Sequence, residues 1–421
     1  MRHLNTLLAG SIALCASAQA QQPPVMLRVN PKLEDVRLEV ELFQQAPVDP
    51  QTGSVTVNGQ TYQGSQSQGW TYAGRGVTIG VPVLVRTSWF DTDFSKYACV
   101  ARVDGRTVPV DHAKAFGRVP GGAEATLRFD VPFELGWCSY VLVQCTYQSQ
   151  VWDLQVDEDR AARATWPREW PSGMDRFLGA EPGVDPANQA IKAAAEGATR
   201  GGPRTTTPFV AAKNAVLAIC GRWRSGSSTT SIYGQKGALR GINFSDSATA
   251  ASGYSGRPVG IDAGGTPIEL AATCVAGLRS INIPARVVTC LTARSSRAAS
   301  STSRGDSVQF RFICECYVPD VGWIPFDPMV VRQQSTNQPT GPIKGFANLP
   351  DLRDCLPLAY RLVPDGYSKA DRFAAWGWKA KVGADLQVDV ERAVSRIGFD
   401  TTGRGNGKVP QMPAPVSDEA P

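Results

Sequence analysis

The chain has 421 residues, which is more than one ordinary hydrophobic core accommodates, so we expect two globular parts. Its hydrophobic content of 42% and charged content of 19% are typical of a folded protein and exclude an intrinsically disordered chain. The formal net charge of +5 is small for this length and the basic residues are dispersed, so the sequence predicts no nucleic-acid partner.

Residues 1–20 have the pattern of an export signal. A short basic start precedes an apolar stretch at 7–16, and Ala18-Gln19-Ala20 is a small-x-small cleavage site. The apolar stretch is too short to span a bilayer, and no later stretch approaches the roughly eighteen apolar residues that a transmembrane helix needs. We therefore expect an exported protein, periplasmic or extracellular, that has no transmembrane span.

The cysteines are compatible with export but do not define a metal site. Of the 10 cysteines, Cys15 falls in the signal, which leaves an odd number in the mature chain and the disulfide connectivity open. There is no Cys-x-x-Cys pair, and His112 is the remaining mature histidine, so the sequence predicts no metal and no cofactor. Cys138 and Cys145, seven apart on one expected strand, are interpreted as two core thiols that do not bond to each other.

Residues 21–170 have the alternation of half-buried strands. Apolar and polar side chains alternate in Val36-Arg37-Leu38-Glu39-Val40, and similar segments follow at 77–85, 126–131 and 139–147. Asn58-Gly59 is typical of a two-residue hairpin turn. The pattern predicts an N-terminal antiparallel β-sandwich of immunoglobulin-like type.

Helix signals begin after the proline-rich run at 165–171. Asp185-Pro186 predicts an alanine-rich helix to about Glu196, and Thr207-Pro208 predicts another from Phe209 to Trp223. Thr266-Pro267 repeats this start, Glu269 completes a capping box, and the helix is expected to run to about Ser280. Cys274 lies inside that helix among apolar residues and is expected to be buried.

Segments in the second half of the chain share a recognisable motif order. They are the helix start at 264–269, Ile283-Pro284-Ala285-Arg286, Arg311-Phe312-Ile313-Cys314-Glu315, and Gly322-Trp323-Ile324-Pro325-Phe326-Asp327-Pro328. Together, over about residues 205–330, they resemble the core of the transglutaminase-like superfamily of cysteine proteases and acyltransferases.

The resemblance implies an α+β fold for the whole chain. A transglutaminase-like, papain-like α+β domain at 171–340 would follow the sandwich. We expect a C-terminal extension at 341–402, with strands near 359–363 and 372–382, to extend or cover this domain. Residues 403–421, rich in Gly and Pro, are expected to form a disordered tail.

The family places a cysteine nucleophile at the helix start, a histidine on a following strand, and an aspartate after the Gly-Trp motif. These positions hold Pro267, Arg311 and Asp327 in this chain. Proline has no thiol, and arginine stays protonated and cannot accept a proton. We therefore expect no catalytic residue at these positions. Arg311 should either form a direct ion pair with Asp327 that closes the site, or project past Asp327 toward the groove and anchor a carboxylate-bearing ligand; we favour the ion pair, because Asp327 would otherwise have lost its partner.

Other cysteines are poor replacements for the missing nucleophile. Cys314 and Cys316 lie on the face of their strand opposite to Arg311, and Cys290 is expected to be packed in the core. The sequence therefore favours an exported, non-catalytic module at the cell envelope that binds a peptide or protein or serves in assembly. Its candidate binding residues are Arg311, Asp327, Glu315 and Trp323. The alternatives are a cysteine peptidase or acyltransferase with a relocated nucleophile, and a purely structural domain; the oligomeric state stays open.

Overall fold

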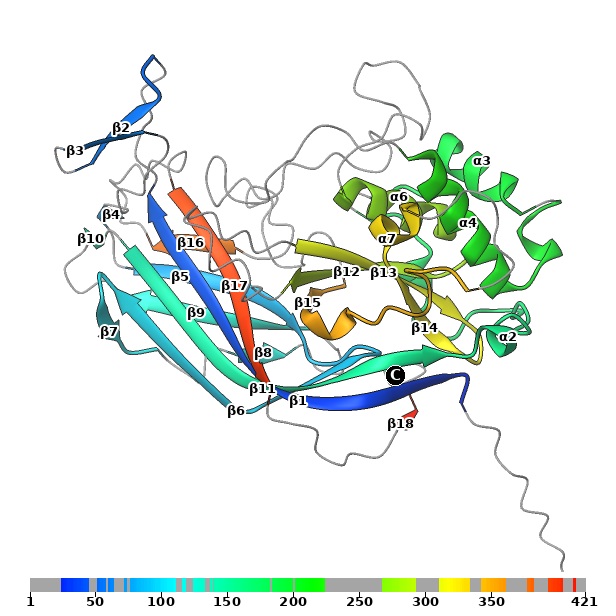
Figure 1. Ribbon diagram of the computed structural model, residues 1–421, viewed down its shortest axis with the longest axis horizontal. Helices are drawn as coiled ribbons and strands as arrows, with labels where there is room; N and C mark the ends of the chain where they lie inside the picture. Colours follow the sequence, from blue (N-terminus) through cyan, green and yellow to red (C-terminus); the bar gives the residue numbers. More distant parts are fainter. Residues whose placement is uncertain are drawn as a thin grey trace, which may run out of the picture.

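The structure is a computed structural model with mixed helices and strands, which confirms the α+β class (Figure 1). It describes residues 24–44, 51–57, 60–63, 72–73, 76–110, 116–118, 124–132, 137–138, 140–181, 184–199, 201–223, 267–292, 310–333, 342–360, 377–381, 393–403 and 412–413. The export signal, Asn58-Gly59, His112 and Thr266 lie outside these residues, as does the side chain of Cys138. Among the described helices, none is long and apolar enough to cross a membrane.

The β-rich part contains a long antiparallel sheet and a shorter one. The long sheet has the order β17-β1-β11-β6-β7, with β18 also paired to β1. Its strands are β1 (Met26–Gln44), β6 (Phe90–Val103), β7 (Arg106–Val108), β11 (Tyr140–Val156), β17 (Ala393–Gly403) and β18 (Met412–Pro413). The shorter sheet has the order β16-β5-β9-β8, with β5 (Gly76–Leu84), β8 (Phe116–Arg118), β9 (Glu124–Pro132) and β16 (Gly377–Lys381).

Alternating side chains of both sheets enter one hydrophobic core. Leu38 and Val143 of the long sheet belong to the same buried cluster as Ile79 and Leu127 of the shorter one. This follows from the two-residue period of a strand, which sends alternate side chains to the core. Two small ribbons, β2 (Ser54–Val57) with β3 (Gln60–Gln63) and β4 (Tyr72–Ala73) with β10 (Trp137–Cys138), complete this part.

The other part packs helices against the sheet β14-β13-β12-β15. The strands are β12 (Ala285–Thr292), β13 (Phe310–Val318), β14 (Gly322–Phe326) and β15 (Cys355–Ala359). The helices are α2 (Glu158–Ala161), α3 (Gln189–Gly197), α4 (Pro208–Arg222), α6 (Pro267–Ser280) and α7 (Pro328–Arg332), with 3-10 turns η1 (Asp175–Phe177), η2 (Pro203–Thr205) and η5 (Leu352–Asp354). Helix α6 contacts β12 and β13 directly, so this sheet is covered and its strands are almost continuously buried.

Three expectations from the sequence need correction. Helix α3 begins at Gln189 rather than at Asp185-Pro186, because Asn188 is its N-cap and accepts hydrogen bonds from the backbone amides of Ala190 and Ile191. The strand expected near 372–382 is β16, which pairs with β5 rather than with the helix-covered sheet, whereas β15, which ends at Ala359, does extend that sheet by pairing with β12 (Figure 1). Strand β17, which the sequence did not predict, pairs with β1. Within the expected disordered tail, Met412 and Pro413 pair with β1.

Candidate functional site

Helix α6 begins at Pro267, as the capping pattern predicted. Pro267 is exposed, whereas Cys274, two turns further along, is completely buried, which confirms its expected place in the core. Cys274 lies inside the helix and away from the positive end of the helix dipole, so it lacks the setting that activates a thiol. The helix start therefore presents a pyrrolidine ring, which has neither thiol nor hydroxyl.

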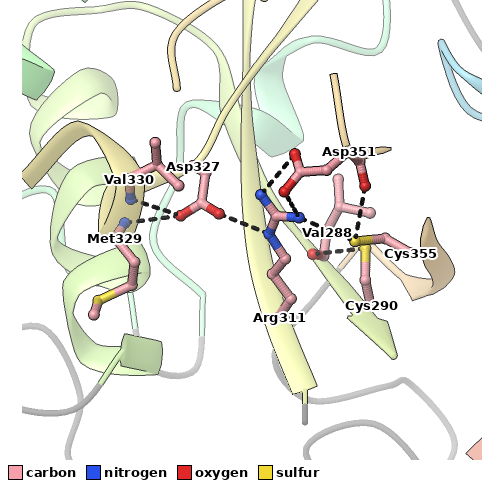
Figure 2. A network of polar contacts seen from close by, with 8 residues as sticks. All are labelled: Val288, Cys290, Arg311, Asp327, Met329, Val330, Asp351 and Cys355. Atoms are coloured by element: carbon pink, nitrogen blue, oxygen red, sulfur yellow. Dashed lines mark hydrogen bonds and ion pairs between the residues drawn. The ribbon is translucent and has the colours of Figure 1, made fainter. Parts of the chain in front are cut away.

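The predicted ion pair between Arg311 and Asp327 is confirmed. Arg311 Nε donates to Asp327 Oδ2 at 2.7 Å, and the Asp327 side chain is only 4% exposed (Figure 2). The other carboxylate oxygen, Oδ1, caps α7 by accepting hydrogen bonds from the backbone amides of Met329 and Val330 at 2.8 and 3.2 Å. Asp327 thus holds a helix start on one side and a guanidinium on the other.

Asp327 is also positioned through its own backbone. Its amide donates to the carbonyl of Gly345 at 2.8 Å. Gly345 has a φ of +88°, and a Cβ there would lie 2.8 Å from Cβ of Val330, so glycine is required for this approach. The segment containing Gly345 therefore fixes where the Asp327 carboxylate lies against α7.

The outer edge of the guanidinium is held by a second carboxylate that the sequence analysis missed. Arg311 Nη1 and Nη2 donate to Asp351 Oδ2 and Oδ1 at 2.9 and 3.2 Å, and Nη1 also contacts Cys355 Sγ at 3.4 Å. Figure 2 shows Arg311 between Asp327 on one side and Asp351 with Cys355 on the other. We call Arg311, Asp327, Asp351 and Cys355 the Arg311 cluster. Asp351 is 53% exposed, so the cluster reaches from a buried carboxylate to the surface.

The electrostatics of this cluster favour fixed charges over proton transfer. Burial alone lowers the pKa of the Arg311 guanidinium, but Cys355 and the two carboxylates outweigh it and raise that pKa above its ordinary value. Burial raises the pKa of the Cys355 thiol to about 11, although the neighbouring Arg311 opposes the shift. At neutral pH the arginine is therefore a cation and this thiol is protonated, so the cluster contains no thiolate.

Glu315 and Trp323, the other candidate binding residues, are buried away from solvent. Glu315 is 0% exposed and pairs with Arg286, whose Nε lies 2.7 Å from Glu315 Oε2. The Arg286 guanidinium also lies 3.9 Å from the ring centre of Trp323 and 3.5 Å from that of Tyr360. Ser88, from the β-rich part, donates to Glu315 Oε1 at 3.3 Å, so this interior network joins the two parts of the chain.

No described cysteine has the surroundings of a nucleophile. Cys314 and Cys316 are buried, and Cys314 Sγ lies 3.7 Å from the carbonyl of Ala271 on α6. Arg311 has an odd number on β13 whereas Cys314 and Cys316 have even numbers, so the two cysteines lie on the face opposite to Arg311, as expected. Burial raises the pKa of Cys290 and Cys314 well above the ordinary thiol value. Among the described residues, no group of three or more His, Cys, Asp or Glu is arranged to hold a metal.

Comparison with known proteins agrees with the motif order. Residues 236–328 match the family model of the transglutaminase-like superfamily. A candidate cysteine protease from Cytophaga hutchinsonii is 13% identical, with a TM-score of 0.48 over 91% of this chain and 95% of that chain. The periplasmic domain of TgpA from Pseudomonas aeruginosa is 14% identical, with a TM-score of 0.27 over 62% of this chain and 88% of that chain.

These structural likenesses are too weak to carry an argument about function, and no curated protein sequence matches the chain. The family model covers the segment that contains α6, β12, β13 and β14, and it confirms the resemblance that the motifs indicated. Residues 236–328 are therefore the part of the chain that is similar to the transglutaminase-like superfamily.

Proposed function

We propose that this protein is an exported, non-catalytic member of the superfamily that binds a peptide or protein, or serves in assembly, at the cell envelope. In this proposal residues 1–20 direct export, and an immunoglobulin-like sandwich precedes a papain-like domain. The observation that carries the non-catalytic part is the Arg311 cluster. The position of the family's base holds a permanent cation, fixed by Asp327 at 2.7 Å and by Asp351 at 2.9 Å.

A cysteine protease or acyltransferase needs a thiolate and a base within hydrogen-bond reach of it. Pro267 supplies no thiol, and a guanidinium paired with carboxylates accepts no proton. The thiol nearest to Arg311, Cys355, is 1% exposed, and burial raises its pKa to about 11. A relocated nucleophile at Cys355 would thus require the thiol to become exposed and to lose its proton despite its raised pKa.

The surface around the cluster supports binding better than chemistry. Asp351 is exposed, whereas Asp327 is buried and paired. We propose that a partner contacts the exposed rim of the Arg311 cluster and that Arg311 and Asp327 keep this rim in place. Glu315 and Trp323, both buried, would support the site from the interior rather than touch the partner.

The first test of the proposal is chemical. Folded full-length protein is treated with an iodoacetamide probe at pH 7.5 and assayed for peptide hydrolysis, ester hydrolysis and amine incorporation. We expect uniformly slow alkylation and no turnover, because the eight cysteines whose side chains the structure describes are all buried. One fast-reacting cysteine whose substitution by alanine removes a measured turnover would overturn the non-catalytic proposal and establish the relocated nucleophile.

The second test concerns binding. A random peptide display library is selected on the folded protein, and the enriched peptides are then titrated against Asp351→Asn and Asp354→Asn. Both aspartates are exposed and lie at the same short turn, η5, but Asp351 is the one that pairs with Arg311. We expect Asp351→Asn to change peptide affinity several-fold and Asp354→Asn to leave it unchanged. Failure to enrich any peptide, or equal effects of both substitutions, would contradict the binding role and favour a purely structural domain.

A further inference from the structure

Two buried cysteine pairs lie in geometries that suit cross-linking. Cys99 on β6 and Cys145 on β11 are directly opposite each other in the antiparallel register, and their sulfur atoms are 3.0 Å apart. This is closer than the roughly 3.5–4.0 Å at which non-bonded heavy atoms attract each other best. Directly opposite residues of an antiparallel pair have Cα atoms about 4.5–5.5 Å apart, within the range that a disulfide spans.

The second pair joins two helices of the transglutaminase-like domain. Cys220 on α4 and Cys274 on α6 have sulfur atoms 3.7 Å apart, and both side chains are essentially inaccessible to solvent. The two helices pack against each other, and one turn beyond Cys274 a Cβ on Gly277 would lie 2.4 Å from the end of the Ile219 side chain. The two sulfur atoms therefore face each other across packed helices, and a disulfide would require them to approach further, to the roughly 2.0 Å of an S–S bond.

We propose that Cys99–Cys145 and Cys220–Cys274 are disulfides in the mature protein. The oxidant is a disulfide, either that of an oxidoreductase in the exported compartment or glutathione disulfide. One cysteine thiolate attacks it and forms a mixed disulfide, and the second thiolate then displaces the remaining oxidant sulfur. Two protein thiols lose two protons and two electrons to become one S–S bond, and the oxidant disulfide becomes two thiols.

The proposed cross-links would have different structural consequences. Cys99–Cys145 ties neighbouring strands of one sheet. Cys220–Cys274 ties α4 to α6 across the sequence 224–266, so the position of the helix that begins at Pro267 would not depend on that intervening segment. Five mature cysteines would remain reduced. They are Cys138 and four that the structure places in the core, namely Cys290, Cys314, Cys316 and Cys355.

Peptide mapping of refolded protein tests the proposal independently of export and of any binding role. The reduced full-length chain is refolded in a glutathione redox buffer, alkylated in denaturant without reductant, and digested for mass spectrometry. We expect the cross-linked peptides Cys99–Cys145 and Cys220–Cys274, each lighter than its reduced components by two hydrogen atoms, and alkylated forms of the other cysteines. Alkylation of all four paired cysteines, or a dominant different pairing, would overturn the proposal.

Stability measurements distinguish a disulfide from a pair of packed thiols. We expect Cys220→Ala to lower the melting temperature by roughly 5 °C or more when the protein is refolded with glutathione, and by clearly less when it is refolded in reductant. Cys316→Ala is the matched control, because Cys316 is equally buried but outside both pairs, and its cost should not depend on the redox buffer. If the fall in melting temperature is the same in both buffers for Cys220→Ala as well as for Cys316→Ala, Cys220 is a packed thiol and not part of a disulfide. Because Cys99→Ala tests the other pair in the same way, each bond can be rejected separately.

Discussion

Replacement of Arg311 by alanine tests whether the Arg311 cluster stabilises the fold. The substitution removes the cation from a carboxylate whose side chain is only 4% exposed, so Asp327 is left charged and largely desolvated. Breaking a buried ion pair by removing one partner typically costs about 3–5 kcal/mol, because the remaining charge is uncompensated. The substitution should therefore lower the free energy of unfolding.

Two features of the structure reduce this magnitude. The Arg311 side chain is 17% exposed, so water reaches part of the site, and Asp327 keeps its hydrogen bonds from the amides of Met329 and Val330. We therefore expect Arg311→Ala to lower the free energy of unfolding by about 2–4 kcal/mol. For a domain of this size, that corresponds to a fall in melting temperature of roughly 5–10 °C.

Asp351→Ala is the control that separates the buried half of the cluster from the exposed half. Asp351 is 53% exposed, and ion pairs of this kind contribute only about 0–1 kcal/mol after solvent screening. Thermal unfolding and urea titration of both variants provide the measurement. A melting temperature of Arg311→Ala within a degree or so of the unmodified protein, or no lower than that of Asp351→Ala, would refute a stabilising role for the pair.

The remaining predictions concern the interior network, the thiols and restored chemistry. Glu315→Ala should cost about 3–5 kcal/mol in urea unfolding because it leaves Arg286 buried without its carboxylate, whereas Glu315→Gln should cost less; equal costs would contradict a charge-based role. The pKa of the Cys355 thiol is about 11 in the folded protein, against an ordinary value of 9.0 that we take for the unfolded chain. The contribution of this protonated thiol to the free energy of unfolding is therefore complete below pH 9 and is lost as the pH rises from 9 to 11. The stability difference between unmodified protein and Cys355→Ala should therefore shrink by about 2–3 kcal/mol over that window, and a difference independent of pH would count against the assignment. Pro267→Cys with Arg311→His should give little hydrolysis of generic peptides or esters, so robust turnover would show that substrate geometry was retained.

The local features of the site could be predicted from the sequence because they depend on neighbours in the chain. Proline is well suited to the first turn of a helix, so Pro267 indicated where α6 begins, and the apolar surroundings of Cys274 indicated its burial. The ordered motifs placed Arg311 and Asp327 on neighbouring elements and thereby predicted their ion pair. The predicted start of α3 was wrong because Asp185-Pro186 has the composition of a helix start, whereas Asn188 is the residue that caps the helix.

Only the tertiary structure decided which distant groups surround Arg311 and which sheets the C-terminal strands join. An arginine with a buried carboxylate on one edge still needs acceptors on the other, but no motif marks Asp351 or Cys355 as its neighbours. These residues reach Arg311 because β15, which begins at Cys355, pairs with β12 beside β13. Strand β17 joins the other sheet, where it pairs with β1. The two-residue period of a strand determines which side chains share a face, but it contains no information about which strand lies alongside. That choice is made by the total burial and hydrogen bonding of the assembled sheets.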